Sequence, residues 1–320
     1  MITKRRFNFN PGKEELVPEI KGEGAKMSGK RKKKNRTADK KKITVAALIC
    51  ALISAGMVIY MVTVAVIHRQ KENEYEALRA ALQTGGDTAA AEREVIVIED
   101  VPARGDESTA EETSAQQEET VAVPLRAPER LIDWDLLHET NEDIYAWIVI
   151  PDSSIDYPVL QHPSDDTYYL NYNLDGSRGY PGCIYTERAN SKDFSDFQTV
   201  LYGHNMRNGT MFAGLHNWED ASYFDSHEFL YIYTPEESFV YRIFAAYRYS
   251  DAHLIYAFDY STEEGRDAFL KAAYDAAHSG DSTDHYRDGV EPDDTDHIIT
   301  LSTCVGGQSD RRYLVQAVRR

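Results

Sequence analysis

The chain has 320 residues, of which 42% are hydrophobic and 28% charged, and its formal net charge is −18. It contains three cysteines, too few for the multi-disulfide framework of a small secreted domain. No Cys-x-x-Cys pair or histidine-rich cluster occurs, so we expect neither a zinc site nor another metal or cofactor. The charge is uneven, because residues 1–42 carry 15 Lys and Arg against 5 Asp and Glu, whereas the remaining residues carry 20 against 48.

Residues 43–67 explain this division. They form a run of 25 residues without Asp, Glu, Lys, Arg or His, which exceeds the ~20 needed for a transmembrane helix. A cleaved signal peptide is the alternative, but its apolar core is normally only about 7 to 15 residues long. Basic residues beside a span stay in the cytoplasm, so the arm 1–42 is predicted inside and everything after the span outside the cell membrane. We interpret the arm as an orientation signal and a contact for anionic lipid, not as a nucleic-acid site.

Residues 68–128 are predicted to be an extracellular stalk or linker. Within them, 72–83 have two open interpretations, a polar helix or a solvated stalk. The helix is suggested by an apolar stripe at helical spacing, formed by Tyr75, Leu78 and Leu82. Residues 84–128 are rich in Thr, Ala, Glu and Gln and are expected to be disordered, apart from the apolar Val95–Ile98. Such a tether would confine a folded domain near membrane-bound partners.

Residues 129–320 are long enough for one folded domain with its own core. A short amphipathic helix is predicted over 131–137. Short segments rich in β-branched and aromatic residues predict strands over 146–149, 155–160, 182–185, 199–201, 229–233 and 240–249. Ser261–Glu264 is a capping-box pattern, and the apolar spacing that follows predicts one helix ending near Gly280. The fold class is therefore mainly β, an antiparallel sheet or barrel interrupted by one helix.

A hairpin is predicted at the C-terminal end of this domain. Residues 298–303 and 313–318 read as two strands, and the loop between them contains Gly306 and Gly307. In an antiparallel pair, Cys304 and Arg312 would end the two strands at the same mouth, where facing Cβ atoms are roughly 5 Å apart. The two-residue period places Ser302 on the same strand face as Cys304.

His204 is the candidate partner for the Cys304 thiol, because it follows the apolar run 199–201 and therefore also lies at a strand end. A cysteine nucleophile commonly pairs with a histidine that is distant in sequence. Each residue alone has an ordinary structural explanation, since buried cysteines pack as small hydrophobes and arginines at hairpin tips are usually solvated. A Cys183–Cys304 disulfide is another alternative, although Cys183 lies in a strand-like run typical of a packed side chain.

Taken together, these segments resemble a known family. The Thr300-Leu301-Ser302-Thr303-Cys304 pentapeptide, the Gly203-His204-Asn205 turn after a strand and the Arg312 that opens the next strand resemble class B sortases, the membrane-anchored cysteine transpeptidases of Gram-positive bacteria. The resemblance covers about residues 129–320. It implies a closed or nearly closed β-barrel with an N-terminal helix and a further helix inserted before the strand that carries Cys304.

The resemblance also implies an activity. Cys304 would attack a sorting-signal peptide of the Asn-Pro-X-Thr type after its Thr, His204 would carry the proton, and Arg312, preferred over Arg311, would stabilise the oxyanion. Ser302 and Thr303 are expected to contact the substrate. A cell-wall precursor amine would then resolve the thioester and anchor a surface protein. Joining of pilin subunits, hydrolysis by a plain cysteine peptidase and a catalytically silent, membrane-tethered peptide-binding module remain alternatives.

Overall fold

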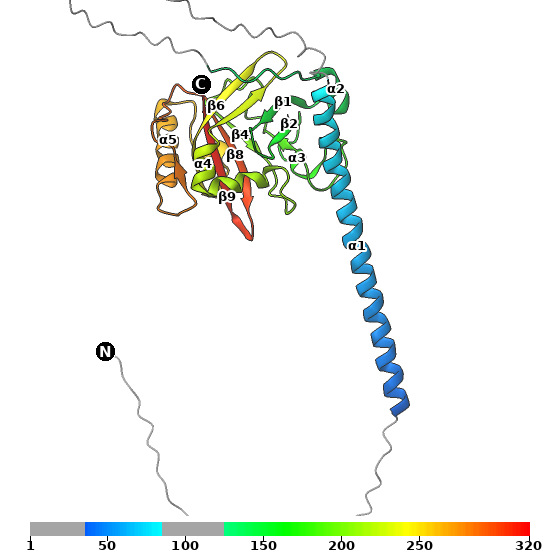
Figure 1. Ribbon diagram of the computed structural model, residues 1–320. Helices are drawn as coiled ribbons and strands as arrows, with labels where there is room; N and C mark the ends of the chain where they lie inside the picture. The colour runs from blue at the N-terminus through cyan, green and yellow to red at the C-terminus, as the bar shows by residue number, and fades with distance from the viewer. Residues whose placement is uncertain (1–35, 85–124) are drawn as a thin grey trace, which may run out of the picture. The chain divides into compact units, whose positions relative to one another are not determined.

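The computed structural model describes residues 36–84 and 125–320 of the chain (Figure 1). The basic arm up to residue 35 and the linker over 85–124, including Val95–Ile98, lie outside the described residues. Within the described part, the strands are β1 (Ile144–Val149), β2 (Asp156–Leu160), β3 (Ile184–Tyr185), β4 (Gln198–Tyr202), β5 (Phe229–Tyr233), β6 (Ser238–Ser250), β7 (His285–Tyr286), β8 (Ile298–Val305) and β9 (Gln308–Arg319).

These strands form a closed barrel. Their order is β5-β1-β2-β3-β4-β8-β9-β6, and β5 pairs with β6 as well as with β1, which joins the two ends. β7 adds a short edge to β6 outside this ring. Two neighbouring pairs, β2–β3 and β4–β8, are parallel, and the other pairs are antiparallel. Closure leaves each of the eight strands with a partner on both sides, so the barrel has no open edge of its own. The barrel predicted from the resemblance is confirmed.

Apolar side chains fill the barrel and also cover part of its outside. The larger buried cluster includes Trp147, Tyr157 and Leu301. A second buried cluster lies where α5 (Glu263–Ala277) packs against β6, the position of the orange helix in Figure 1. This helix is the predicted insertion before the strand that carries Cys304. Its N-cap is Thr262, whose hydroxyl accepts from the backbone N–H of Gly265, one residue later than the capping-box pattern at Ser261 indicates.

Short helical segments complete the domain. The amphipathic helix expected over 131–137 is α2 (Trp134–Thr140), whose N-cap is Asp133 because that carboxylate accepts from the backbone N–H of Leu136. The others are α3 (Tyr168–Asn171), η1 (Phe212–Glu219), α4 (Ala221–Ser226) and η2 (Leu254–Tyr256). Sequence patterns did not indicate η1 or α4, yet η1 packs against β8 and β9 and so supports the end of the barrel described below.

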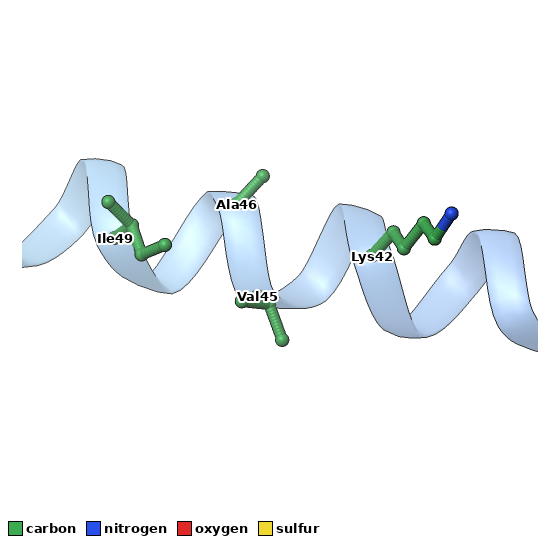
Figure 2. A pocket seen from close by; sticks show the side chains of 4 residues that line it. All are labelled: Lys42, Val45, Ala46 and Ile49. Carbon is green, nitrogen blue, oxygen red and sulfur yellow. The ribbon is translucent and has the colours of Figure 1, made fainter.

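α1 (Arg36–Thr84) contains the apolar segment. Its part Lys42–Leu82 is long and apolar enough to cross a membrane, and most of its large side chains over 43–67 are exposed, as lipid contact requires. Lys42, Val45, Ala46 and Ile49 line a hollow on this helix, and Figure 2 shows their side chains. All four side chains belong to one helix, so the hollow is a space between neighbouring side chains and not a binding site.

The C-terminal part of α1 packs onto the barrel domain. Tyr75, Leu78 and Leu82 are buried in the same core as the barrel strands. The Tyr75 hydroxyl donates to the carbonyl oxygen of Gly182 at 2.8 Å, and Arg79 Nε donates to that of Asp156 at 2.7 Å. Of the two interpretations left open for 72–83, the helix is the one found. The stalk expected over 68–128 therefore begins as a packed helix, because its apolar stripe finds a partner surface on the domain.

We predict that Tyr75→Ala loosens this packing and exposes the Cys183 thiol, which contacts the Tyr75 side chain. Truncating a large buried aromatic side chain costs about 3 kcal/mol or more, so undocking should become roughly 100-fold more frequent. The measurement is the rate at which iodoacetamide labels Cys183 in the full chain in detergent micelles, read by peptide mapping. Asn73→Ala, at an exposed position of the same helix, is the matched control. Equal labelling rates in the two variants would contradict the packing role of Tyr75.

Candidate active site

The site forms where β4 and β8 end side by side. The two strands run parallel, and Tyr202 pairs with Ser302 in their register. The backbone N–H of Gly203 then donates to the carbonyl oxygen of Ser302 at 3.2 Å, and the Thr303 hydroxyl donates to that of Gly203 at 2.9 Å. Position 203 has no room for a side chain, since an added Cβ would lie 2.5 Å from Ile184 and 2.7 Å from Phe212. Glycine therefore lets the turn before His204 sit close to the barrel.

Asn205 adds a third tie between the same two segments. Its side-chain Nδ2 donates to the backbone carbonyl oxygen of Cys304 at 2.8 Å. Since Asn205 directly follows His204 in the chain, this bond links the backbone of the candidate proton carrier to that of the candidate nucleophile. Three hydrogen bonds, from Gly203, Thr303 and Asn205, thus join residues 203–205 to residues 302–304.

Cys304 and Arg312 face each other across the end of the hairpin. They are paired in the β8–β9 register, as predicted, and a register shift follows between Cys304 and Val305. Cys304 is exposed and Cys183 is buried, and both are free thiols, so the disulfide alternative is excluded. Arg312 Nη1 donates to the carbonyl oxygens of Ser309 and Arg311, each at 3.0 Å. These bonds hold one side of the guanidinium against its own hairpin.

His204 lies on the other side of the site, partly buried. Its Nε2 lies 2.7 Å from the carbonyl oxygen of Leu170. A carbonyl only accepts, so Nε2 carries the proton and Nδ1 has the lone pair that can take up another. Burial lowers the pKa of His204 below its ordinary value, outweighing the opposing effect of the Leu170 hydrogen bond. The neutral imidazole therefore predominates at neutral pH. The ring also packs edge-on against Tyr180, with centroids 4.9 Å apart.

The side chains of Cys304, His204 and Arg312 all line one cleft. Its volume of about 420 Å³ is typical of ligand pockets. Its lining includes His204, Cys304, Arg312, Ser302, Tyr185 and Leu314. Arg311 instead lines a separate hollow with Arg248 and Asp281, in agreement with the preference for Arg312, which was predicted to lie opposite Cys304. Ser302 is 7% exposed, and Thr303 reaches the cleft lining although its hydroxyl is bound to Gly203. The predicted site residues are Cys304, His204, Arg312, Ser302 and Thr303, and their catalytic and substrate-binding roles stay predictions.

Glu187 and His253 also line the cleft. The Glu187 side chain is buried, and its Oε1 lies 2.5 Å from Nε2 of the half-exposed His253. Burial raises the pKa of Glu187, an effect that the His253 contact reduces. This pair connects the segment after β3 to the segment after β6.

Sequence reasoning assigned no role to Asn205 and did not notice His216, whose Nε2 lies 3.1 Å from the carbonyl oxygen of Cys304. The position of Asn205 next to His204 was the available signal, and so was the spacing of His216 and Glu219, three residues apart in one helical turn. Across residues 36–84 and 125–320, no group of three or more His, Cys, Asp or Glu side chains is arranged to hold a metal ion.

Comparison with known proteins identifies the family. A family model described as the Sortase domain matches residues 148–320, more than half of the chain. The chain belongs to the sortase family. Sortase B of Listeria monocytogenes is 32% identical over 169 residues, which are 52% of this chain and 65% of that protein. The match therefore spans slightly less than two thirds of the Listeria sortase.

The solved structures agree with class B. Sortase B of Clostridium perfringens superimposes with a TM-score of 0.53 at 27% identity, covering 59% of this chain and all of that chain. A Staphylococcus aureus sortase B, solved as a complex with its substrate, gives a TM-score of 0.51 at 25% identity over 58% of this chain and 83% of that chain. The predicted resemblance to class B sortases is thus confirmed, and this family consists of cysteine transpeptidases.

The two free thiols of the sortase domain should differ sharply in reactivity. Burial raises the pKa of the Cys183 thiol to about 12, so at pH 8 only about one molecule in ten thousand carries its thiolate. Cys304 is exposed and faces Arg312. Iodoacetamide at pH 8 should therefore modify Cys304 and spare Cys183 in the folded full chain, as peptide mapping would measure. Equal modification of both cysteines would contradict this, and both should react once the protein is unfolded in guanidinium.

Proposed function

We propose that this protein is a class B sortase-type transpeptidase that cleaves a sorting signal of the Asn-Pro-X-Thr type after Thr and transfers the acyl group to a cell-wall amine. The observation that carries the proposal is the single cleft that contains a free thiol, a partly buried imidazole and a guanidinium. Family membership supports the same reaction class, and the Staphylococcus aureus relative is known as a substrate complex.

In the proposed acylation, the Cys304 sulfur attacks the backbone carbonyl carbon of the Thr residue in the signal. His204 accepts the thiol proton at Nδ1, for which its neutral form is suited. Arg312 donates to the developing oxyanion. Its Nη1 is bound to carbonyl oxygens of its own hairpin, so Nε and Nη2 are the donors proposed to reach the substrate. The carbon–nitrogen bond then breaks, His204 returns the proton to the departing amine, and a thioester remains on Cys304.

In the proposed second half-reaction, an amine of a peptidoglycan precursor attacks the thioester carbonyl. His204 takes a proton from the attacking nitrogen and passes it to the Cys304 sulfur as the carbon–sulfur bond breaks. The products are a new amide and the free thiol, so nothing is oxidised or reduced. Ser302, on the cleft side of β8, is proposed to contact the substrate, and Thr303 to contribute there through its backbone.

We propose that α1 anchors this domain in the cell membrane by a single span, with the N-terminus in the cytoplasm and the sortase domain outside. The apolar helix is long enough to cross, and the charge of the arm that precedes it favours this orientation. This location would bring the cleft near secreted proteins and lipid-linked wall precursors. The proposed parts of the chain are the cytoplasmic arm over 1–42, the membrane span over 43–67, the stalk or linker over 68–128 and the sortase domain over 129–320.

A peptide assay tests the function. The full chain in detergent micelles is incubated with Asn-Pro-X-Thr peptides ending in Gly, Ala or Ser, with and without an amine acceptor, and products are followed by mass spectrometry. We expect an acyl adduct on Cys304 and an amine-dependent ligation product. Cys304→Ala should abolish the adduct, and His204→Ala should slow its formation by roughly 10²–10⁴-fold. Cleavage that added amine leaves unchanged would indicate a peptidase, and no adduct with any peptide would indicate a binding module.

The two arginines of the hairpin provide a matched comparison. Arg312→Ala should lower the acylation rate by about 10²–10³-fold, the usual loss when one oxyanion donor is removed. Arg311→Ala should change it by less than about threefold, because Arg311 faces the hollow beside Arg248 and Asp281. Single-turnover acylation rates measure both. The reverse order of the two effects would assign the role to Arg311 and refute the assignment to Arg312.

A further inference from the structure

The carbonyl group of Cys304 is held by side chains that the proposed chemistry does not use. The regular pairing of β8 with β9 is interrupted directly after Cys304, so the ladder alone does not fix the peptide that follows the nucleophile. Asn205 Nδ2 lies 2.8 Å and His216 Nε2 lies 3.1 Å from this carbonyl oxygen. His216 comes from η1, a segment that contacts both strands of the hairpin.

Glu219 determines which hydrogen bonds His216 can make to Asn205 and to the Cys304 carbonyl group. The Glu219 carboxylate lies 2.7 Å from Nδ1 of His216, and a carboxylate only accepts, so Nδ1 carries a proton. The other ring nitrogen, Nε2, is then free to accept from Asn205 Nδ2 at 2.9 Å. The Asn205 amide has two hydrogens, one for His216 and one for the Cys304 carbonyl. If His216 is doubly protonated, Nε2 donates directly to that carbonyl. In both protonation states, His216 helps to hold the Cys304 carbonyl group in place.

The His216 and Glu219 pair is itself supported from several directions. Arg248 Nη2 of β6 lies 3.5 Å from the second carboxylate oxygen of Glu219. The Tyr313 ring of β9 lies against the His216 ring, with centroids 5.3 Å apart. His285 Nε2 approaches the backbone carbonyl oxygen of Glu219 at 3.1 Å. The imidazole therefore has little freedom to turn away from Cys304.

We propose that His216, oriented by Glu219, is a positioning residue for the nucleophile. It fixes the Asn205 amide, which in turn fixes the Cys304 carbonyl and ties it to the His204 backbone. Sulfur and imidazole then keep one relative placement through both half-reactions. This inference rests on the proposed function because it takes Cys304 as the nucleophile. Misplacement of reacting groups by about 1 Å can lower a rate by roughly 10²-fold, so a device of this kind has a measurable effect.

The test compares His216→Ala, His216→Gln and the control His278→Ala, whose imidazole is exposed at the end of α5. All are measured as full chains in detergent micelles. We expect His216→Ala to lower the kcat of acylation by the best Asn-Pro-X-Thr peptide roughly tenfold or more, with KM changed by less than about twofold. His216→Gln should recover most of this loss, because its amide can also bond to Asn205 or to the carbonyl. His278→Ala should match the parent protein.

Alkylation of Cys304 by iodoacetamide gives a readout that needs no peptide substrate. The rates should follow the same order, slowest in His216→Ala, because thiolate formation depends on the placement of His204 and Arg312. If no peptide acylates the parent protein, the proposed function fails while this comparison still decides the inference. Unchanged alkylation and acylation in a folded His216→Ala protein, or a loss in His216→Gln as large as in His216→Ala, would overturn the positioning role.

Glu219→Gln keeps the side-chain volume and serves if His216→Ala does not fold. It removes the carboxylate that fixes the proton on Nδ1. A slower alkylation of Cys304 in this variant supports the proposal, whereas a rate equal to that of the parent overturns it.

Discussion

The site depends on the hydrogen bonds between the turn after β4 and the end of β8. These strands are parallel neighbours in the barrel, so their ends emerge at the same rim although about a hundred residues separate them. Gly203, Thr303 and Asn205 provide the three bonds, and the absence of a side chain at Gly203 permits the close approach. His204 and Cys304 are therefore carried by backbones that cannot move independently. Antiparallel pairing then adds Arg312 opposite Cys304.

The barrel and the three candidate catalytic residues were accessible from sequence because their signals are local. Alternating apolar residues mark the strands, and two-residue periodicity places Cys304 and Arg312 at one mouth. The resemblance to class B sortases supplied the closure of the barrel and identified the helix predicted from the capping-box pattern as an insertion. The predicted position opposite Cys304 favoured Arg312 over Arg311, and the two side chains line different hollows.

Other features were not accessible because they depend on tertiary packing. The stripe of Tyr75, Leu78 and Leu82 is visible in the sequence, but only a partner surface decides between a docked helix and a solvated stalk. His216 and Asn205 bond to a backbone carbonyl 88 and 99 residues away, and no periodicity encodes such a contact. Thr262 caps α5 in place of Ser261, whose hydroxyl bonds to Asp259 instead. Local patterns thus locate elements, and packing determines which polar groups complete the site.

The docked end of α1 has a consequence for the thiols. It buries Cys183 beneath Tyr75, and this burial raises the pKa of the Cys183 thiol, whereas Cys304 is exposed and lines the cleft. Two accessible thiols can form a disulfide with each other, and the burial of Cys183 disfavours this reaction. The same packing that stabilises the domain thereby leaves one sulfur available for chemistry.

A crystal structure of the protein trapped as its thioester, with an Asn-Pro-X-Thr peptide on Cys304, tests the central claim most directly. We predict that the acyl carbonyl oxygen accepts from the Arg312 guanidinium, that His204 Nδ1 faces the leaving-group side, and that Asn205 stays bonded to the Cys304 carbonyl. An acyl oxygen turned away from Arg312, or an Asn205 amide detached from Cys304, would contradict the account.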